Sequence, residues 1–338
     1  MQLPLQPVTP PAGSGRARRT SWFRLAVTGV VIAATLSGCV VRVVYNQLDW
    51  LALWYVEDYF DLDSAQEEQA KQMIGRTISW HRETQLPRYA NLVRTLLAGV
   101  GPPVDPEFLA DRYAEVVGLW DELLRQVAPD FAILLQSLSD AQVEELFANL
   151  AEENRDLARD YSGVSREERR AKQDKAIIKV FRRFTGRLSP GQEALVRTRT
   201  ARFHDLSADW LRRRSAWQGE FRVLMAGRKA DPLFAERIAD LLLNPNQFDS
   251  AGYRKLVLEN QQASFALVAA VLSSLSPKQS EHLRNHLTTY ARDFDALVRD
   301  KTGQARGKGK GQTSNQEKRH DEAARDTSVG TPPEAAGA

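Results

Sequence analysis

The chain has 338 residues, with 46 lysines and arginines against 43 aspartates and glutamates. Four of the arginines precede Cys39 and no acidic residue does, which leaves 42 basic and 43 acidic residues from Cys39 onward. The basic charge therefore gives no reason to expect a nucleic-acid partner, and we expect none. Cys39 is the only cysteine, so no internal disulfide can form and packing must supply the stability.

The N-terminus is predicted to carry an export signal. Arg16, Arg18, Arg19 and Arg24 precede an apolar run over residues 25–36. That run is shorter than the roughly 20 apolar residues of a spanning helix. A basic stretch, a short apolar run and small residues are typical of a secretory signal peptide, here residues 1–38.

The end of this signal, Leu36-Ser37-Gly38-Cys39, resembles the bacterial lipobox. The resemblance implies that Cys39 is acylated, palmitate included, and becomes the first residue of the mature protein. Several acyl chains on one residue give stable anchoring. The next residue is Val40 and not aspartate, which in bacterial lipoproteins favours the outer membrane. The implied address is the periplasmic face of a Gram-negative outer membrane, with a buried cysteine or a plain membrane anchor as the alternatives.

Residues 39–61 are predicted to form the acylated tether and an aromatic, membrane-proximal segment. Four β-branched valines within residues 40–44 indicate a short extended tether. Trp50 and Trp54 then have helical spacing. Tryptophan and tyrosine are favoured at the headgroup level of a bilayer. The alternative is a first core helix, which we favour because the acidic side chains of this segment would be repelled by an anionic membrane.

The same segment carries a first resemblance. Tyr45-Asn46-Gln47-Leu48-Asp49-Trp50-Leu51, placed just after a lipidated cysteine, resembles a group of uncharacterised proteobacterial lipoproteins. The resemblance implies an address and a domain of unknown function, and no activity.

Residues 62–300 are predicted to be all-α, an elongated bundle of about eight helices. Proline at position 87 predicts a kink within residues 64–97, because proline removes a helical hydrogen bond. The remaining polar and apolar spacing predicts helices over residues 106–127, 129–138, 139–161, 165–185, 190–225, 231–243, 250–275 and 277–300. Residues 301–338 hold hardly any large apolar side chain and are predicted to be a disordered tail.

A pentapeptide recurs four times, each time at a predicted helix start. It consists of a leucine, a serine or aspartate, two variable residues and a glutamine. Serine or aspartate at the N-cap and glutamine three residues later form a capping box. The copies are Leu62–Gln66, Leu138–Gln142, Leu188–Gln192 and Leu275–Gln279. Their irregular spacing does not indicate a solenoid.

These copies carry a second resemblance, to the Leu-Thr-x-x-Gln motif of the Spy/CpxP-like periplasmic proteins, although serine or aspartate here replaces the threonine. Those proteins are helical, dimeric chaperones or stress-sensor modulators that work without ATP. The resemblance implies a chaperone-like or envelope-stress role.

Two histidines are the only metal candidates. His282 and His286 are four residues apart and would share one helical face as half of a transition-metal site. The alternative, which we favour, is a histidine at the edge of the core, because His286 adjoins the apolar stripe of Leu283 and Leu287. We expect no metal or other cofactor. The sequence also lacks a nucleophile elbow, a phosphate loop and a Cys/His pair, so we expect no enzymatic activity.

The densest positive charge lies in two groups, Lys172, Lys175, Lys179, Arg182 and Arg183, and then Arg212, Arg213 and Arg214. Such side chains usually face water. Contact with anionic lipid headgroups or with an acidic partner is the alternative.

The leading hypothesis is a lipid-anchored, non-enzymatic module that binds envelope or unfolded proteins. A structural or assembly adaptor for one dedicated envelope partner and a metal-responsive sensor are the alternatives. The oligomeric state is not readable from the sequence.

Overall fold

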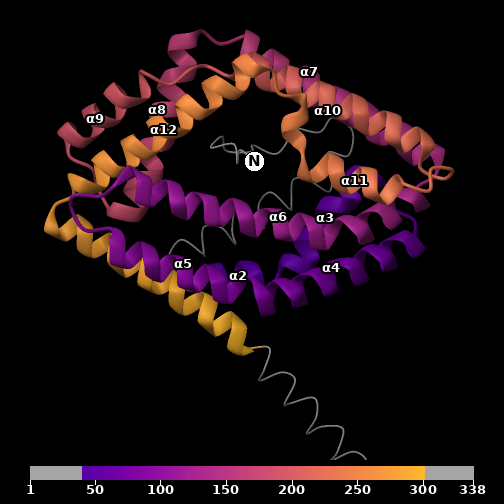
Figure 1. Ribbon diagram of the computed structural model, residues 1–338, viewed down its shortest axis with the longest axis horizontal. Helices are drawn as coiled ribbons and strands as arrows, with labels where there is room; N and C mark the ends of the chain where they lie inside the picture. Colours follow the sequence, from indigo (N-terminus) through magenta and orange to yellow (C-terminus); the bar gives the residue numbers. More distant parts are fainter. Residues whose placement is uncertain (1–39, 301–338) are drawn as a thin grey trace, which may run out of the picture.

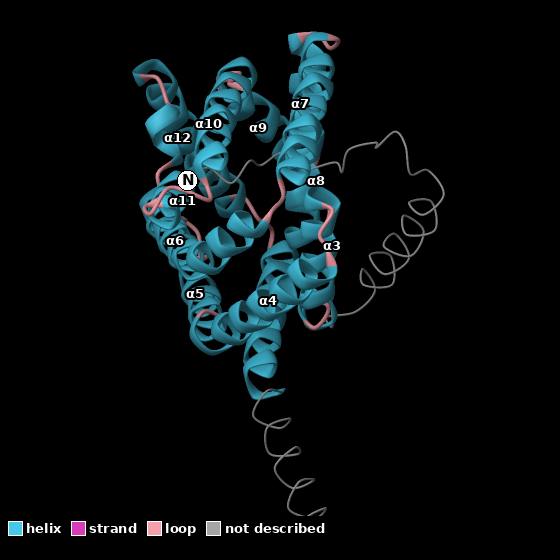
Figure 2. Cartoon of the chain, turned by 90° about the vertical axis from the view of Figure 1, so that its right-hand side faces the viewer, coloured by secondary structure: helices cyan, strands magenta, loops and turns pink. Residues whose placement is uncertain are grey.

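The computed structural model describes residues 40–300, which are helical almost throughout (Figure 1). The predicted signal peptide, Cys39 and the predicted tail lie outside the described residues. The all-α prediction is confirmed. The predicted number of about eight helices was too low, because the described part holds eleven α-helices, α2 to α12, and a further helix over residues 277–300. Figure 2 shows only helices and loops in this part of the chain.

The helices take up the following bounds. The first six are α2 (Val40–Tyr45), α3 (Leu48–Phe60), α4 (Ser64–Thr84), α5 (Leu86–Gly99), α6 (Pro106–Ser137) and α7 (Asp140–Ser162). They are followed by α8 (Arg166–Thr185), α9 (Pro190–Thr200), α10 (Ser207–Gly227), α11 (Phe234–Leu243), the short 3-10 helix η1 (Pro245–Phe248) and α12 (Ala251–Ser273). The kink predicted at Pro87 is present as the break between α4 and α5.

Two predictions of local structure were wrong because packing overrides local preference. The β-branched residues after Cys39 form helix α2, since Tyr45 is buried with Leu86 and Leu297. Pro129 lies inside α6 instead of starting a new helix. Ala128 and Ala132 on either side of it are almost fully buried, so the helix runs on through the core.

The prediction of one long helix over residues 190–225 was also wrong, because the helix is interrupted between α9 and α10. The Asn260 side chain of α12 holds the backbone of that break. Its amide nitrogen donates to the His204 carbonyl at 2.9 Å, and its oxygen accepts from the His204 N–H at 2.8 Å. The longest described helix is α6, with 32 residues and a length of about 48 Å.

The helices follow a flattened closed outline (Figure 1). Helices α7 to α12 lie along one side of it, and α2 to α6 lie along the other. The two sides are joined by the packing of α11 and α12 against α6 and of α3 against α7. The structure is therefore a ring of short helical contacts and not a single parallel bundle.

Four clusters of buried apolar side chains hold this outline together. The largest joins α6, α7, α10 and α11 around Leu138, Met225 and Phe234. A second joins α8, α9 and α12. The third joins α3, α4 and α6, and the fourth joins α2 and α5 to helix 277–300. Burial of this kind contributes about 1.5–3 kcal/mol for each large apolar side chain.

Within residues 40–300, α12 is the one helix whose length and composition would allow it to cross a membrane. Its Leu267 and Val271 are buried in the second cluster against α8 and α9. These contacts make α12 part of the helical body.

Candidate functional site

All four pentapeptides start helices through capping boxes, as predicted. Asp63, Ser139 and Ser189 accept from the N3 amides of α4, α7 and α9, and the N3 glutamine reaches back to each cap. Ser276 and Gln279 form the same pair of bonds, at 3.3 and 2.9 Å, at the start of helix 277–300.

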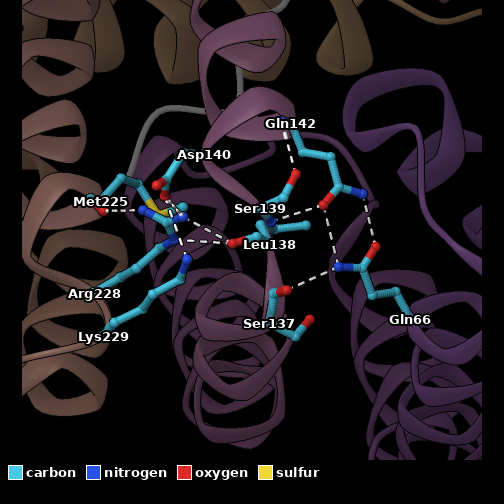
Figure 3. A network of polar contacts seen from close by, with 9 residues as sticks. All are labelled: Gln66, Ser137, Leu138, Ser139, Asp140, Gln142, Met225, Arg228 and Lys229. Carbon is cyan, nitrogen blue, oxygen red and sulfur yellow. Dashed lines mark hydrogen bonds and ion pairs between the residues drawn. The ribbon is translucent and has the colours of Figure 1, made fainter.

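The sequence did not reveal that these capping boxes dock on one another in pairs. The first pair joins α4 to α7 (Figure 3). The Gln66 amide donates to the Ser137 carbonyl at 2.9 Å, and the Gln142 amide donates to the Asp61 carbonyl at 2.9 Å. The two amides also bond each other, at 2.7 and 3.2 Å. Gln66 is 5% exposed, so its own bonds are largely shielded from water, whereas the bond from Gln142 to Asp61 lies at the surface.

The second pair joins α9 to helix 277–300 by the same contacts. Gln192 donates to the Ser274 carbonyl at 3.0 Å, and Gln279 donates to the Arg187 carbonyl at 2.8 Å. The two amides again bond each other, at 2.9 and 3.0 Å. In both pairs each glutamine binds the carbonyl just before the leucine of its partner. The pentapeptide is therefore a docking element as well as a cap.

Arg228, at the end of α10, seats the second pentapeptide (Figure 3). Its side chain is nearly buried and donates to the Leu138 carbonyl at 2.8 and 3.2 Å and to the Met225 carbonyl at 2.9 Å. It also pairs with Asp140, whose pKa the hydrogen bonds from Arg228 and Lys229 lower. No sequence signal distinguishes this arginine from a surface one.

The structure brings the two candidate histidines together. Their Nε2 atoms lie 3.1 Å apart, and Phe184 packs edge-on against His286. Burial, His282 and Arg183 all lower the pKa of His286. Among residues 40–300, no group of three side chains could hold a metal ion. The pair thus has no third protein ligand there.

Four of the first group of predicted cations form a surface together with Arg197 of α9, which the sequence did not single out. We call it the basic surface: Lys172, Lys175, Lys179, Arg182 and Arg197. The fifth predicted cation, Arg183, lies near His286 instead. The α8 members of the basic surface recur every three or four residues along one side of the helix, over about 15 Å. Two grooves meet at Lys175. One lies between α8 and α9 over Ile178, and the other runs toward the start of α8 past Val164 and Ala171.

The charge of the basic surface is poorly neutralised. Residues 166–202 hold twelve lysines and arginines against four acidic residues. Arg182 and Arg197 share Glu193, and their hydrogen bonds to it lower its pKa. Lys172, Lys175 and Lys179 make no ion pair within the described part of the chain. Ile178, Val164 and Ala171 line the grooves beside these cations. This surface offers positive charge next to apolar atoms.

The second group of predicted cations is different, because each member pairs with an acid. Arg212 pairs with Asp209, Arg213 with Asp249 at 2.6 Å, and Arg214 with Glu153 at 2.7 Å. Arg214 ties α10 to α7, Arg213 ties it to the residues before α12, and Arg212 pairs within α10 itself. They contribute little free positive charge to the surface.

The aromatic segment has two faces. Leu53 and Val56 pack into the third cluster against α4, and Phe60 packs on Phe131 of α6. The other face is exposed and we call it the aromatic face: Val43 (48%), Val44 (38%), Trp50 (41%), Trp54 (44%) and Tyr55 (58%). The core interpretation and the membrane interpretation therefore each fit one side of this segment.

Comparison with known proteins gives one match. Residues 58–254, more than half of the chain, match a family of unknown function (DUF6279). No curated protein and no solved structure matches the chain. The matched span contains the first pair of pentapeptides and the whole basic surface. It does not reach Cys39, and it does not bear on the resemblances to lipoproteins or to the Spy/CpxP-like proteins, which stay predictions.

Proposed function

The chain belongs to this family of unknown function, so its role has to come from its own residues, and we propose that it is a non-enzymatic protein-binding module. Acylated Cys39 would hold it at the periplasmic face of the outer membrane. Its work would be chaperone-like or related to envelope stress. The lipobox resemblance supports the address, and the surface of the helical body supports the binding role.

The observation that carries the binding role is the basic surface. Three of its lysines have no acidic neighbour in ion-pair contact among residues 40–300, so their charge is available to a partner. The surface is grooved and its floor includes Ile178. Lysine stems add apolar area while their charged heads stay in water. A protein segment that carries both acidic and apolar side chains fits this chemistry.

The extent of the basic surface bears on two forms of the proposal, a general chaperone and an adaptor for one partner. A general chaperone binds many unfolded segments and needs a broad apolar surface. An adaptor needs one compact patch for one partner. The compact extent of the basic surface supports the adaptor as the alternative function.

Aggregation assays test the chaperone form. Residues 40–300, which contain all four buried clusters, are mixed at equal molar ratio with an aggregation-prone test protein and followed by light scattering without ATP. We expect suppression, and we expect Lys175→Glu with Lys179→Glu to abolish it. Lys255→Glu with Arg292→Glu is the matched control, because it makes the same charge change at exposed cations elsewhere.

Two results would count against this form. Equal suppression by both double variants would mean that the basic surface is not the binding site. No suppression by the wild-type chain would exclude general chaperoning and leave the adaptor, whose partner would then be sought by crosslinking from α8.

A further inference from the structure

The aromatic face is the largest group of exposed apolar side chains in the described structure, and it does not belong to the basic surface. Five exposed apolar residues lie on two consecutive short helices, α2 and α3. The other large exposed apolar side chains stand singly on α6, α8, α10 and α12 and in the turn before α11. Clustered exposure of this kind marks an interaction surface.

We propose that the aromatic face lies at the headgroup level of the bilayer and is a second, non-covalent membrane contact. This inference rests on the membrane address of the proposed function but not on protein binding. Tryptophan and tyrosine suit this depth because the ring is apolar and its N–H or O–H remains hydrated.

The position of the face in the chain selects a bilayer over a protein partner. Residues 1–39 lie outside the described structure. They include the apolar run 25–36 and end at Cys39, the residue before α2. Trp50 follows Cys39 by eleven residues, which spans about 17 Å in helical geometry. A chain held in the membrane at or before Cys39 therefore keeps Trp50 and Trp54 close to the headgroups.

The packing of α2 prevents the body from swinging away on a flexible tether. Tyr45 is 7% exposed and packs with Leu86 of α5 and Leu297 of helix 277–300. Its hydroxyl also bonds His81 of α4 at 2.9 Å. Helix α2, which begins at the residue after Cys39, is therefore part of the rigid body, and the aromatic face fixes the orientation of that body on the membrane.

The charges around the face predict which lipids it accepts. Arg42, beside Val43, is already paired with Asp300 at 3.0 Å. Asp49 is exposed in the first turn of α3, and Glu57 lies toward the far end of the same helix. The contact is therefore apolar and not cationic. Binding should therefore be no stronger to anionic than to zwitterionic lipid, in contrast to a polybasic contact.

Quenching by lipid tests the proposal in the full-length chain. The protein carries Trp22→Phe, so that the predicted signal cannot contribute, and it is reconstituted into zwitterionic phosphatidylcholine vesicles with brominated acyl chains. We expect quenching of the tryptophan fluorescence that falls at least threefold in Trp50→Phe with Trp54→Phe. Trp210→Phe, in α10, is the matched control and should leave the quenching in place.

A partition measurement keeps the proposal independent of acylation. Residues 40–300 should bind phosphatidylcholine vesicles at least tenfold more tightly than the variant Trp50→Ser with Trp54→Ser. Val223→Ser with Leu258→Ser, which replaces two exposed apolar residues of α10 and α12, should bind like the wild type.

Unchanged quenching in the Trp50→Phe, Trp54→Phe variant would overturn the proposal. A dimer in sedimentation experiments that dissociates in the Trp50→Ser, Trp54→Ser variant would also overturn it, because a second copy of the chain would then cover the face. If lipid quenching holds while the aggregation and crosslinking assays fail, the protein-binding function fails alone.

Discussion

The docking of paired pentapeptides makes a quantitative prediction for Gln66. Its side chain does two things at once: its oxygen accepts from the Asp63 N–H at 3.0 Å, and its amide nitrogen donates to the Ser137 carbonyl. Gln66→Ala loses the capping bond, at about 1 kcal/mol. It also leaves the Ser137 carbonyl and the Gln142 amide without this partner, at about 1 kcal/mol each. We expect a total loss of about 3 kcal/mol in the free energy of unfolding.

Helix α8 supplies the matched control. Ser165 and Glu168 form a capping box of the same kind, with Glu168 accepting from the Ser165 N–H at 3.0 Å, but it docks on no other helix start. Glu168→Ala should therefore cost only about 1 kcal/mol. Urea unfolding followed by far-UV circular dichroism measures both variants against the wild type.

A double-mutant cycle isolates the docking term. Gln66→Ala and Gln142→Ala should be strongly non-additive, because each removes the partner of the other. The reasoning is refuted if Gln66→Ala costs no more than Glu168→Ala, or if the two glutamine substitutions add independently. In either case the pentapeptide would be a cap and nothing more.

Three further predictions follow from single sites. Burial lowers the pKa of His81, so on acidification the unfolded chain binds a proton before the folded chain does, and the free energy of unfolding falls as the pH drops through about 6.5. His81→Gln should flatten this dependence in urea titrations from about pH 5 to about pH 8. Gly186 has a φ of 78°, so Gly186→Ala should cost about 1–3 kcal/mol in the same assay, and a neutral result would contradict the strain. With two nitrogen ligands and no third in the described part, we expect only weak zinc binding by calorimetry; a tight site lost in His282→Ala with His286→Ala would contradict this.

The helix starts could be predicted from the sequence because a cap is a local feature. Serine or aspartate followed by glutamine three residues later is enough to satisfy the first amides of a helix, wherever the helix packs. The ends and continuities could not be predicted in this way. Pro129 stays helical because its neighbours are buried in the core, and α9 ends where Asn260, some sixty positions away, holds the backbone.

The candidate site was predictable only in part, for a similar reason. The sequence shows where basic side chains are dense, but not which of them have acidic partners. Arg213 and Arg214 are neutralised by Asp249 and Glu153, which are distant in the sequence. The lysines of α8 have no such partner in the described part of the chain. The pairing of the pentapeptides was hidden because capping alone explains every copy, and no spacing identifies the partner of Gln66.

Photocrosslinking in intact cells tests the central claim, partner binding at the basic surface, most directly. A photoreactive residue replaces Lys175 in the full-length chain, and a second strain carries it at Lys255 on α12. The account predicts a discrete protein adduct from position 175 that disappears when Lys172→Glu and Lys179→Glu are added, and no such adduct from position 255. Absence of any adduct from position 175, or the same adducts from both positions, would contradict it.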